Sequence, residues 1–306
     1  MPSGDGCRDE ETEVPVGSYV RPSTIEEAVT ALRDADGAGV PLAGGTDLLV
    51  QAKVGRDVGT VVDLKRLEEV MAIDRDGAYW RIGAGAPAFR IARHEALRAN
   101  LPGLVEGVGL IGSTQIQGRA TLGGNVGNAS PAADAVPALL VNDALVHVAG
   151  PAGRRDVPLA EFITGPGSTA LEVGEFIVAF VVPVAETGQS DAAMRFIPRT
   201  EMDIAVANVA VRLRFEGTEI AAAGVAIGAV GPRAIRVPDA EAALEGQTEP
   251  NDDVLEGVAT ACRAAAAPIT DRRGTVEFRE HAIGVLAARA CRVAAHRART
   301  HGSGQG

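Results

Sequence analysis

The pattern of hydrophobic and polar positions divides this chain of 306 residues into two halves of different character. In the first half, short apolar stretches alternate with stretches of helical spacing. We expect strands over 60–67 and 79–86, a helix that begins after Ser23 or Thr24, and a helix over 87–100 that begins at a proline. Glycine turns fall where the connections belong, so this half is predicted to be a mixture of short strands and helices.

The second half begins near Pro183, where the pattern changes. Two alternating segments, 203–217 and 220–235, are typical of antiparallel strands joined by a turn around Gly217. Two helices are predicted after them, over about 252–266 and 275–297, and the apolar side of the last one is formed by Phe278, Ile283, Leu286 and Val293. Strands followed by helices indicate an α+β fold with a C-terminal module distinct from the first half.

Residues 114–134, TQIQGRATLGGNVGNASPAAD, carry four glycines where a packed core would need bulk. Backbone left this bare is usually approached closely by another group, and exposed N–H groups in a glycine turn bind anions without a lysine. A second bare loop, Ala43-Gly44-Gly45-Thr46-Asp47, lies upstream. We expect the two loops to converge on a phosphorylated cofactor.

Each loop also has a plainer interpretation. The first is explained equally well by an ordinary tight turn in which Asp47 caps the following segment. In the second, Thr121, Asn125 and Asn128 supply polar groups, and Asp134 is a carboxylate in apolar surroundings that needs hydrogen bonds, either structural or from a ligand. The presence of two such loops in one domain favours the cofactor.

The segment GVGLIG at 107–112 fits the G-x-G-x-x-G pattern of dinucleotide-binding folds, and Asp134 lies downstream at roughly the distance of a ribose contact. That pattern requires a buried strand before it and a helix after it. Here the preceding residues have helical spacing and the following ones are broken by glycine. We therefore interpret 107–112 as a connection that leads into the glycine-rich loop.

Composition and charge narrow the class of protein. A formal net charge of −11 argues against a nucleic-acid partner, and a hydrophobic content of 46% suffices for a sizeable core. No apolar run reaches the roughly 18 residues of a membrane span, and the N-terminal residues are acidic, so a cytoplasmic protein is expected. Residues 1–14 are polar and unpatterned and are expected to form a disordered leader.

Side chains for acid–base or metal chemistry are sparse. The five histidines are scattered outside both loops, and Cys7, Cys262 and Cys291 form no CxxC pair, so neither a zinc site nor an iron–sulfur cluster is encoded locally. A cradle with little catalytic machinery is expected where a cofactor carries the chemistry.

Four segments in order, AGGTDLLVQAKVG, TLGGNVGNASPAAD, RTEMDIAVANVAVRL and PITDRRGTVEFREH, resemble the FAD-binding medium subunit of molybdenum hydroxylases, the family of xanthine dehydrogenase and aerobic carbon monoxide dehydrogenase. The resemblance covers about residues 17–296. It implies a two-part FAD-binding domain of the vanillyl-alcohol-oxidase (PCMH) type at 15–182, a C-terminal domain of the CO dehydrogenase flavoprotein type at 183–298, and a tail at 299–306.

The resemblance also implies a cofactor site. FAD would contact Asp134, apolar side chains at Ile111 and Ile177, and Arg195, which falls where the family often has a lysine near the flavin. Some relatives have histidine and serine at positions 46 and 47, and the wider fold uses a histidine there for covalent attachment, so FAD is expected to be held non-covalently here. The backbone N–H groups implied to wrap the pyrophosphate belong to Ala43, Gly44, Gly45, Thr46 and Asp47 and to Thr121, Leu122, Gly123, Gly124 and Asn125.

The function that the resemblance implies is electron relay. Substrate would be hydroxylated at a molybdenum cofactor in a large molybdopterin-binding partner subunit, and electrons would pass through 2Fe-2S clusters in a small partner subunit. The FAD of this chain would then reduce NAD, oxygen or another external acceptor. A stand-alone FAD-dependent oxidase or dehydrogenase of the same fold is the alternative, and a scaffold without cofactor is a third possibility that predicts a colourless protein.

Overall fold

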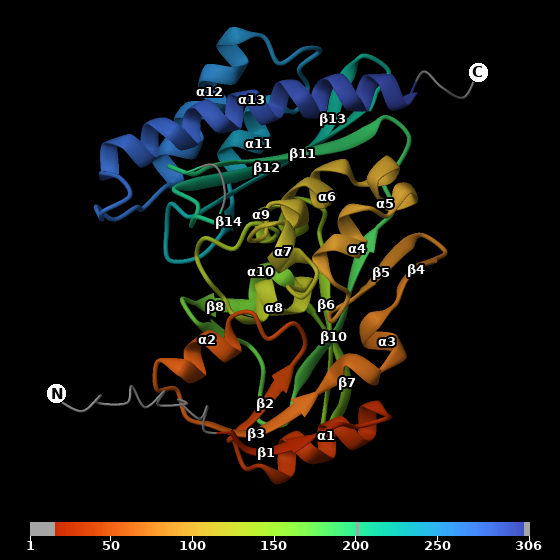
Figure 1. The fold of residues 1–306 in the computed structure, drawn as a ribbon. Helices are drawn as coiled ribbons and strands as arrows, with labels where there is room; N and C mark the ends of the chain where they lie inside the picture. The colour runs from red at the N-terminus through yellow and green to blue at the C-terminus, as the bar shows by residue number, and fades with distance from the viewer. Residues whose placement is uncertain (1–15, 200–201, 303–306) are drawn as a thin grey trace, which may run out of the picture.

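The structure, a computed structural model, describes residues 16–199 and 202–302. The leader expected at 1–14, and residues 303–306 of the expected tail, lie outside the described residues. Figure 1 shows two sheets of the first half at the end of the molecule that carries the N-terminus, a layer of short helices in the middle, and a sheet covered by long helices at the other end. The fold is α+β, as the sequence predicts.

A parallel three-stranded sheet, in the order β1 (Val16–Val20), β3 (Val58–Asp63), β2 (Gly39–Leu42), forms the N-terminal end. The helix α1 (Ile25–Asp34) connects β1 to β2. Thr24 caps this helix as predicted, because its side chain accepts a hydrogen bond from the N–H of Glu27 at 3.1 Å. The first glycine loop leaves β2 and enters α2 (Leu48–Lys53), so the sheet edge fixes the position of the loop.

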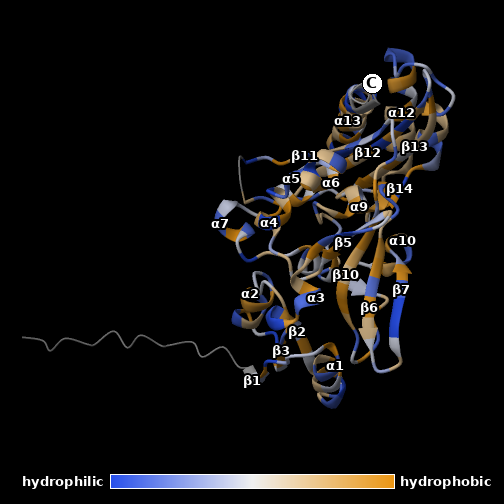
Figure 2. Ribbon diagram, turned by 90° about the vertical axis from the view of Figure 1, so that its right-hand side faces the viewer, coloured by the Kyte–Doolittle hydropathy of each residue, from blue (hydrophilic) through white to orange (hydrophobic). Residues whose placement is uncertain are grey.

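An antiparallel five-stranded sheet lies next, in the order β4 (Ile73–Asp76), β5 (Tyr79–Gly83), β10 (Phe176–Pro183), β6 (Leu145–Gly150), β7 (Gly153–Pro158). Figure 2 shows apolar residues concentrated on β6 and β10 and polar residues along much of β7, at the edge of the sheet. Short helices lie between this sheet and the C-terminal half: α4 (Ala88–Ala92), α5 (Glu95–Asn100), α6 (Pro102–Gly109), α7 (Thr114–Gln117), α8 (Leu122–Gly127) and α9 (Val136–Val141). The remaining short elements of this half are η1 (Leu64–Arg66), α3 (Glu68–Met71), α10 (Leu159–Phe162), β8 (Ile163–Gly165) and β9 (Ser168–Thr169).

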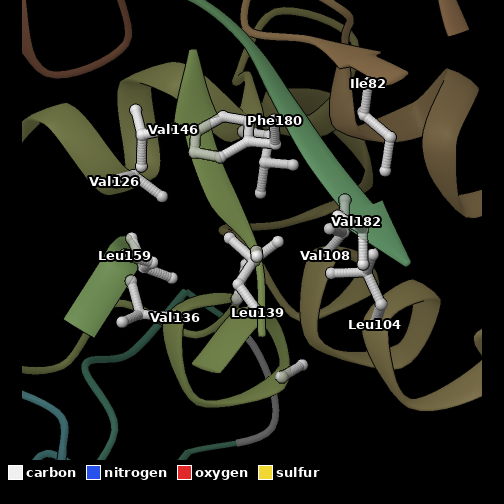
Figure 3. Packing of buried hydrophobic residues seen from close by; sticks show 14 of the residues in the cluster. Ile82, Leu104, Val108, Val126, Val136, Leu139, Val146, Leu159, Phe180 and Val182 are labelled. Atoms are coloured by element: carbon white, nitrogen blue, oxygen red, sulfur yellow. The ribbon is translucent and has the colours of Figure 1, made fainter. Parts of the chain in front are cut away.

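The main core of the first half forms where β6 and β10 meet the short helices. Figure 3 shows Phe180 of β10 and Val146 of β6 in one cluster with Leu104 of α6 and Leu139 of α9, and each of these side chains is fully buried. Complete burial of a side chain of this size contributes roughly 1.5–3 kcal/mol. Val126 of α8 belongs to the same cluster, so the core anchors the second glycine loop.

The C-terminal half is an antiparallel four-stranded sheet in the order β11 (Gln189–Phe196), β12 (Ala207–Glu216), β13 (Glu219–Gly228), β14 (Ile235–Arg236). On one face, α13 (Val276–Gly302) packs on β11 and β12, while α11 (Pro238–Leu244) and α12 (Asp252–Ala265) complete the helical layer. The opposite face packs on α6 and α9 of the first half. No helix in the described part of the chain combines the length and the hydropathy of a membrane span.

Most of the predicted elements are present. The strands expected over 60–67 and 79–86 end at Asp63 and Gly83, and there are three further differences. The helix expected over 87–100 is two helices, α4 and α5, because Nδ1 of His94 accepts a hydrogen bond from the N–H of Leu97 and starts a new helix. The strand expected over 220–235 ends at Gly228, and the chain turns back to form the two-residue β14, which pairs antiparallel with β13.

The third difference concerns Phe278, which the helical spacing placed on the apolar side of the last helix. Ile283 and Leu286 are buried there as predicted, but Phe278 is 42% exposed and packs edge-on against Phe196. Phe278 lies in the first turn of α13, at the edge of the sheet beside the last residue of β11. The segment 107–112 runs from the end of α6 into the following loop, as interpreted from the sequence.

Candidate functional site

The two glycine loops are in direct backbone contact. A Cβ atom on Gly44 would lie 2.1 Å from the carbonyl oxygen of Arg119 and 3.2 Å from the Cα of Ala120. Only glycine leaves room for so close an approach. The loops therefore converge, as the sequence predicts, and a cleft of about 310 Å³ lies between them.

Of the predicted site residues, only Leu122, Asp134 and Arg195 do not line this cleft. The predicted residues that do line it are Ala43, Gly44, Gly45, Thr46, Asp47, Ile111, Thr121, Gly123, Gly124, Asn125 and Ile177. Leu122 is instead fully buried in the core beneath α8, where it anchors the loop from below.

The first loop presents backbone donors that the chain does not use. Among the described residues, no acceptor receives a hydrogen bond from the backbone N–H of Gly44, Gly45, Thr46 or Asp47. Asp47 precedes α2, but its side chain makes no capping hydrogen bond, so the interpretation of this loop as a turn capped by Asp47 does not hold. Unpaired N–H groups of successive residues in one turn form a concavity suited to an anion.

The second loop is largely satisfied within the chain. The N–H of Gly123 donates to the carbonyl of Ala84 at 2.8 Å, and the N–H groups of Gly124 and Asn125 donate to the side-chain and backbone oxygens of Thr121. This differs from the expectation that both loops offer free N–H groups. A Cβ on Gly123 would lie 2.6 Å from the carbonyl oxygen of Ala84, so this glycine is needed for packing against the end of β5.

Apolar side chains form the remaining wall of the cleft. The predicted residues Ile111 and Ile177 are 8% and 6% exposed, and Ile177 sits where the pairing of β10 with β6 shifts register. Leu171 and Phe176, which the sequence did not single out, line the same wall. Phe176 precedes Ile177 on one strand, and its burial follows only from the long-range pairing of β10, so no local signal identified it.

Asp134 and Arg195 form an ion pair outside the cleft. Nη1 of Arg195, on β11, donates to Oδ2 of Asp134 at 2.9 Å, and both side chains are about nine-tenths buried. Oδ1 of Asp134 is buried and has no hydrogen-bond partner among the described residues. Burial raises the pKa of Asp134 to about 6, although the charge of Arg195 opposes that shift. The pair joins the second loop to the C-terminal half.

A polar bridge that the sequence pattern did not indicate spans the edge of the cleft. Nη1 of Arg56 donates to Oε1 of Gln51, and Nε2 of Gln51 donates to Oδ1 of Asn128 at 3.3 Å. All three residues line the cleft. The sequence marked Asn128 as a polar group of its loop. Gln51 and Arg56 lie beyond the first loop, where the sequence pattern does not distinguish them from ordinary solvent-facing residues.

Other reactive groups lie away from the cleft. The described residues contain no group of three or more His, Cys, Asp or Glu side chains placed to hold a metal ion. Cys262 and Cys291 are both buried in the core of the C-terminal half, and burial raises the pKa of the Cys262 thiol to about 12. Cysteines of this kind are inert at neutral pH.

The fold and the cleft fit a phosphorylated cofactor with a large ring system. The unpaired N–H groups of the first loop fit the phosphates, the two contacting glycine loops leave the space, and the isoleucine wall fits a ring system. FAD has both parts.

The chain belongs to the family of FAD-binding subunits of molybdenum-containing dehydrogenases. The family model described as the FAD binding domain in molybdopterin dehydrogenase matches residues 12–185, and the CO dehydrogenase flavoprotein C-terminal domain matches residues 192–294. The chain is therefore the flavin-binding part of an oxidoreductase.

Relatives with known names span nearly the whole chain. The xanthine dehydrogenase FAD-binding subunit of Escherichia coli O157:H7 is 32% identical over 274 residues, which cover 88% of this chain and 92% of the relative. The carbon monoxide dehydrogenase medium chain of Afipia carboxidovorans is 31% identical over 283 residues, covering 92% and 97%. The structure of the cyanide-inactivated Cu,Mo-CO dehydrogenase matches with a TM-score of 0.88 at 30% identity, covering 92% of this chain and 98% of that one.

Proposed function

We propose that this chain binds one FAD non-covalently in the cleft and relays electrons through it within a molybdenum-containing hydroxylase. The observation that carries the proposal is the set of four backbone N–H groups, Gly44 to Asp47, that donate to no acceptor in the described chain. Gly44, Gly45 and Thr46 are half-buried, and N–H groups away from bulk water are almost always paired, so this set requires water or a ligand. The pyrophosphate of FAD supplies acceptors of the right charge.

The residues of the cleft have distinct tasks in this proposal. The first loop holds the pyrophosphate, and Ile111 and Ile177 pack against the apolar ring and exclude water from one side of it. Thr46 and Asp47 occupy the positions where a covalent linkage would need a histidine, so the cofactor is held by contacts alone. FAD, when bound, supplies the exchange of one and two electrons that the protein side chains lack.

The proposed partners are a small subunit with 2Fe-2S clusters and a large molybdopterin-binding subunit. The carbon monoxide dehydrogenase relative is named a medium chain, and the nicotine 6-hydroxylase relative from Paenarthrobacter nicotinovorans a medium subunit. The external acceptor is NAD, oxygen or another oxidant. We further propose that the chain works in the cytoplasm and that its two domains are 15–182 and 183–298, joined by the ion pair of Asp134 and Arg195 outside the cleft.

Co-expression of this chain with its genomic neighbours tests the proposal. We expect a purified complex that contains molybdenum, iron and a flavin that acid releases as FAD. The isolated chain should be yellow and should hydroxylate nothing. A complex without molybdenum and iron would overturn the proposal. Bleaching of the flavin in the isolated chain by an organic substrate would instead support a stand-alone oxidase or dehydrogenase.

A further inference from the structure

The cleft carries little positive charge to balance the pyrophosphate of the proposed FAD. A pyrophosphate diester carries two negative charges at neutral pH, whereas backbone N–H groups contribute only dipoles. The cleft also includes the carboxylate of Asp47. Among the described residues that line it, Arg56 is the only cation.

Arg56 is held at the edge of the cleft by a bridge that connects the two loops. Its guanidinium donates to Gln51 of α2, and Gln51 in turn donates to Asn128, which follows α8. Gln51 and Asn128 thus hold the guanidinium between the element that follows the first loop and the element that follows the second. The carbonyl oxygen of Gln51 accepts a further hydrogen bond, from the N–H of Arg56 itself at 3.0 Å, which fixes the backbone at this position.

We propose that Arg56 is the counter-cation of the FAD pyrophosphate and that Gln51 positions it. The proposal rests on the FAD site described above and adds a side chain to a cradle that otherwise consists of backbone. A guanidinium offers several N–H donors in a planar fork, so Arg56 pairs with phosphate oxygens while one of its N–H groups stays on Gln51.

The chain offers a matched control for this charge. Lys53 and Arg56 are both exposed and both carry one positive charge. Lys53 belongs to the same helix as Gln51, but it does not line the cleft. A general effect of removing positive charge from this surface will therefore affect Lys53→Gln and Arg56→Gln equally. A specific contact with the pyrophosphate will affect only Arg56→Gln.

The experiment measures the affinity of the full chain, freed of flavin, for FAD by flavin fluorescence, with ADP as a competitor that has the pyrophosphate and lacks the flavin. At low salt, Arg56→Gln should weaken FAD and ADP binding about tenfold, while Lys53→Gln should change either by less than about twofold. At 1 M salt, where the Debye length is about 3 Å, the loss for Arg56→Gln should shrink to about twofold. Gln51→Glu, which keeps Arg56 but pairs it with a carboxylate, should weaken FAD binding by several-fold at low salt.

Equal affinities of Arg56→Gln and Lys53→Gln, in a chain whose unaltered form binds FAD, would overturn this inference and leave the proposed function intact. A loss for Arg56→Gln that is unchanged at 1 M salt, or that affects FAD but not ADP, would also overturn it. Failure of the unaltered chain to bind FAD would overturn the proposed function and this inference together.

Discussion

Two sets of backbone N–H groups in this molecule differ in whether the chain supplies a hydrogen-bond acceptor for them. At the start of α6, the N–H groups of Gly103 and Leu104 donate to the carboxylate of Asp191 at 2.7 and 3.0 Å, and the amide of Asn142 donates to the same carboxylate at 2.7 Å. Asp191 comes from β11 and is 1% exposed. In the loop that follows β2, four N–H groups receive no acceptor from the described chain.

The difference separates a structural anion site from a functional one. Where backbone donors join the two halves of the molecule, the chain supplies the anion itself, and Arg297 of α13 reinforces the junction by pairing with Glu106 and donating to the backbone carbonyl of Asp191. Where the donors face the cleft, the acceptor must come from outside. The same chemistry thus stabilises the fold at one place and, in the proposed function, holds the pyrophosphate at the other.

The largest effect is expected from Asp191→Ala. The substitution leaves three buried donors without an acceptor, each at a cost of about 1–3 kcal/mol, so the free energy of unfolding should fall by at least about 3 kcal/mol. Chemical denaturation measures this loss. Asp156→Ala, which removes a half-exposed carboxylate paired with His147, is the control and should cost no more than about 1 kcal/mol. A similar small loss for both variants would mean that Asp191 is not the anion that joins the halves.

The next effect concerns pH, because Asp134 and Asp191 are both buried carboxylates. Burial raises the pKa of each from 3.8 to about 6, while Arg195 opposes the shift at Asp134 and the N–H of Gly103 opposes it at Asp191. Between about pH 4 and 6 the folded protein therefore keeps protons that the unfolded chain has lost, and stability falls as the pH rises through this range. The upper limit is about 3 kcal/mol for each group.

Comparison of the unaltered protein with Asp134→Asn isolates one of these groups. The variant cannot ionise at position 134, so its stability should decline less between pH 4 and 7 than that of the unaltered protein, as measured by denaturation midpoints. Effects of all other titrating groups cancel in the difference. A difference in stability that stays constant over this range would show that Asp134 titrates normally.

A smaller effect, this time on cofactor binding, is expected from Gly44→Ala. The added methyl group would overlap the carbonyl oxygen of Arg119 and push the two loops apart. Restoring their contact around FAD costs about 1–3 kcal/mol, which corresponds to a loss of roughly fivefold to 150-fold in FAD affinity. Gly109→Ala is the control, since a Cβ there meets nothing within 4 Å. Titration with FAD measures the affinity of both variants. Equal affinities would contradict a cradle built by contact of the two loops.

The candidate site could be predicted in part because glycine in the sequence indicates where two backbone segments approach closely. Gly44 and Gly123 both mark close backbone contacts, and the loops around them were located correctly. The sequence could not reveal which N–H groups remain unpaired, because the acceptor for Gly123 is Ala84, on the connection after β5. Long-range pairing of strands decides that partner.

The same limit applies to the fold. Amphipathic helices and alternating strands of the C-terminal half were predicted closely, whereas the break between α4 and α5 depends on the side chain of His94. Arg56 was missed because its place beside the cleft follows from the path of the chain between α2 and β3. Spacing alone does not encode that path.

The smallest predicted effect concerns the residue that follows β13. Ala229 has a φ of +62°, and its N–H donates to the carbonyl of Pro131 at 2.8 Å, so it holds the end of the second loop against the C-terminal half. A left-handed backbone costs a residue with a Cβ roughly 1–2 kcal/mol, of which glycine entropy in the unfolded chain offsets about half. Ala229→Gly should therefore stabilise the protein by up to about 1 kcal/mol, whereas Ala226→Gly, within β13 just before it, should destabilise it. If thermal or chemical denaturation shows a loss for both, the position is not strained and the loop is held by other contacts.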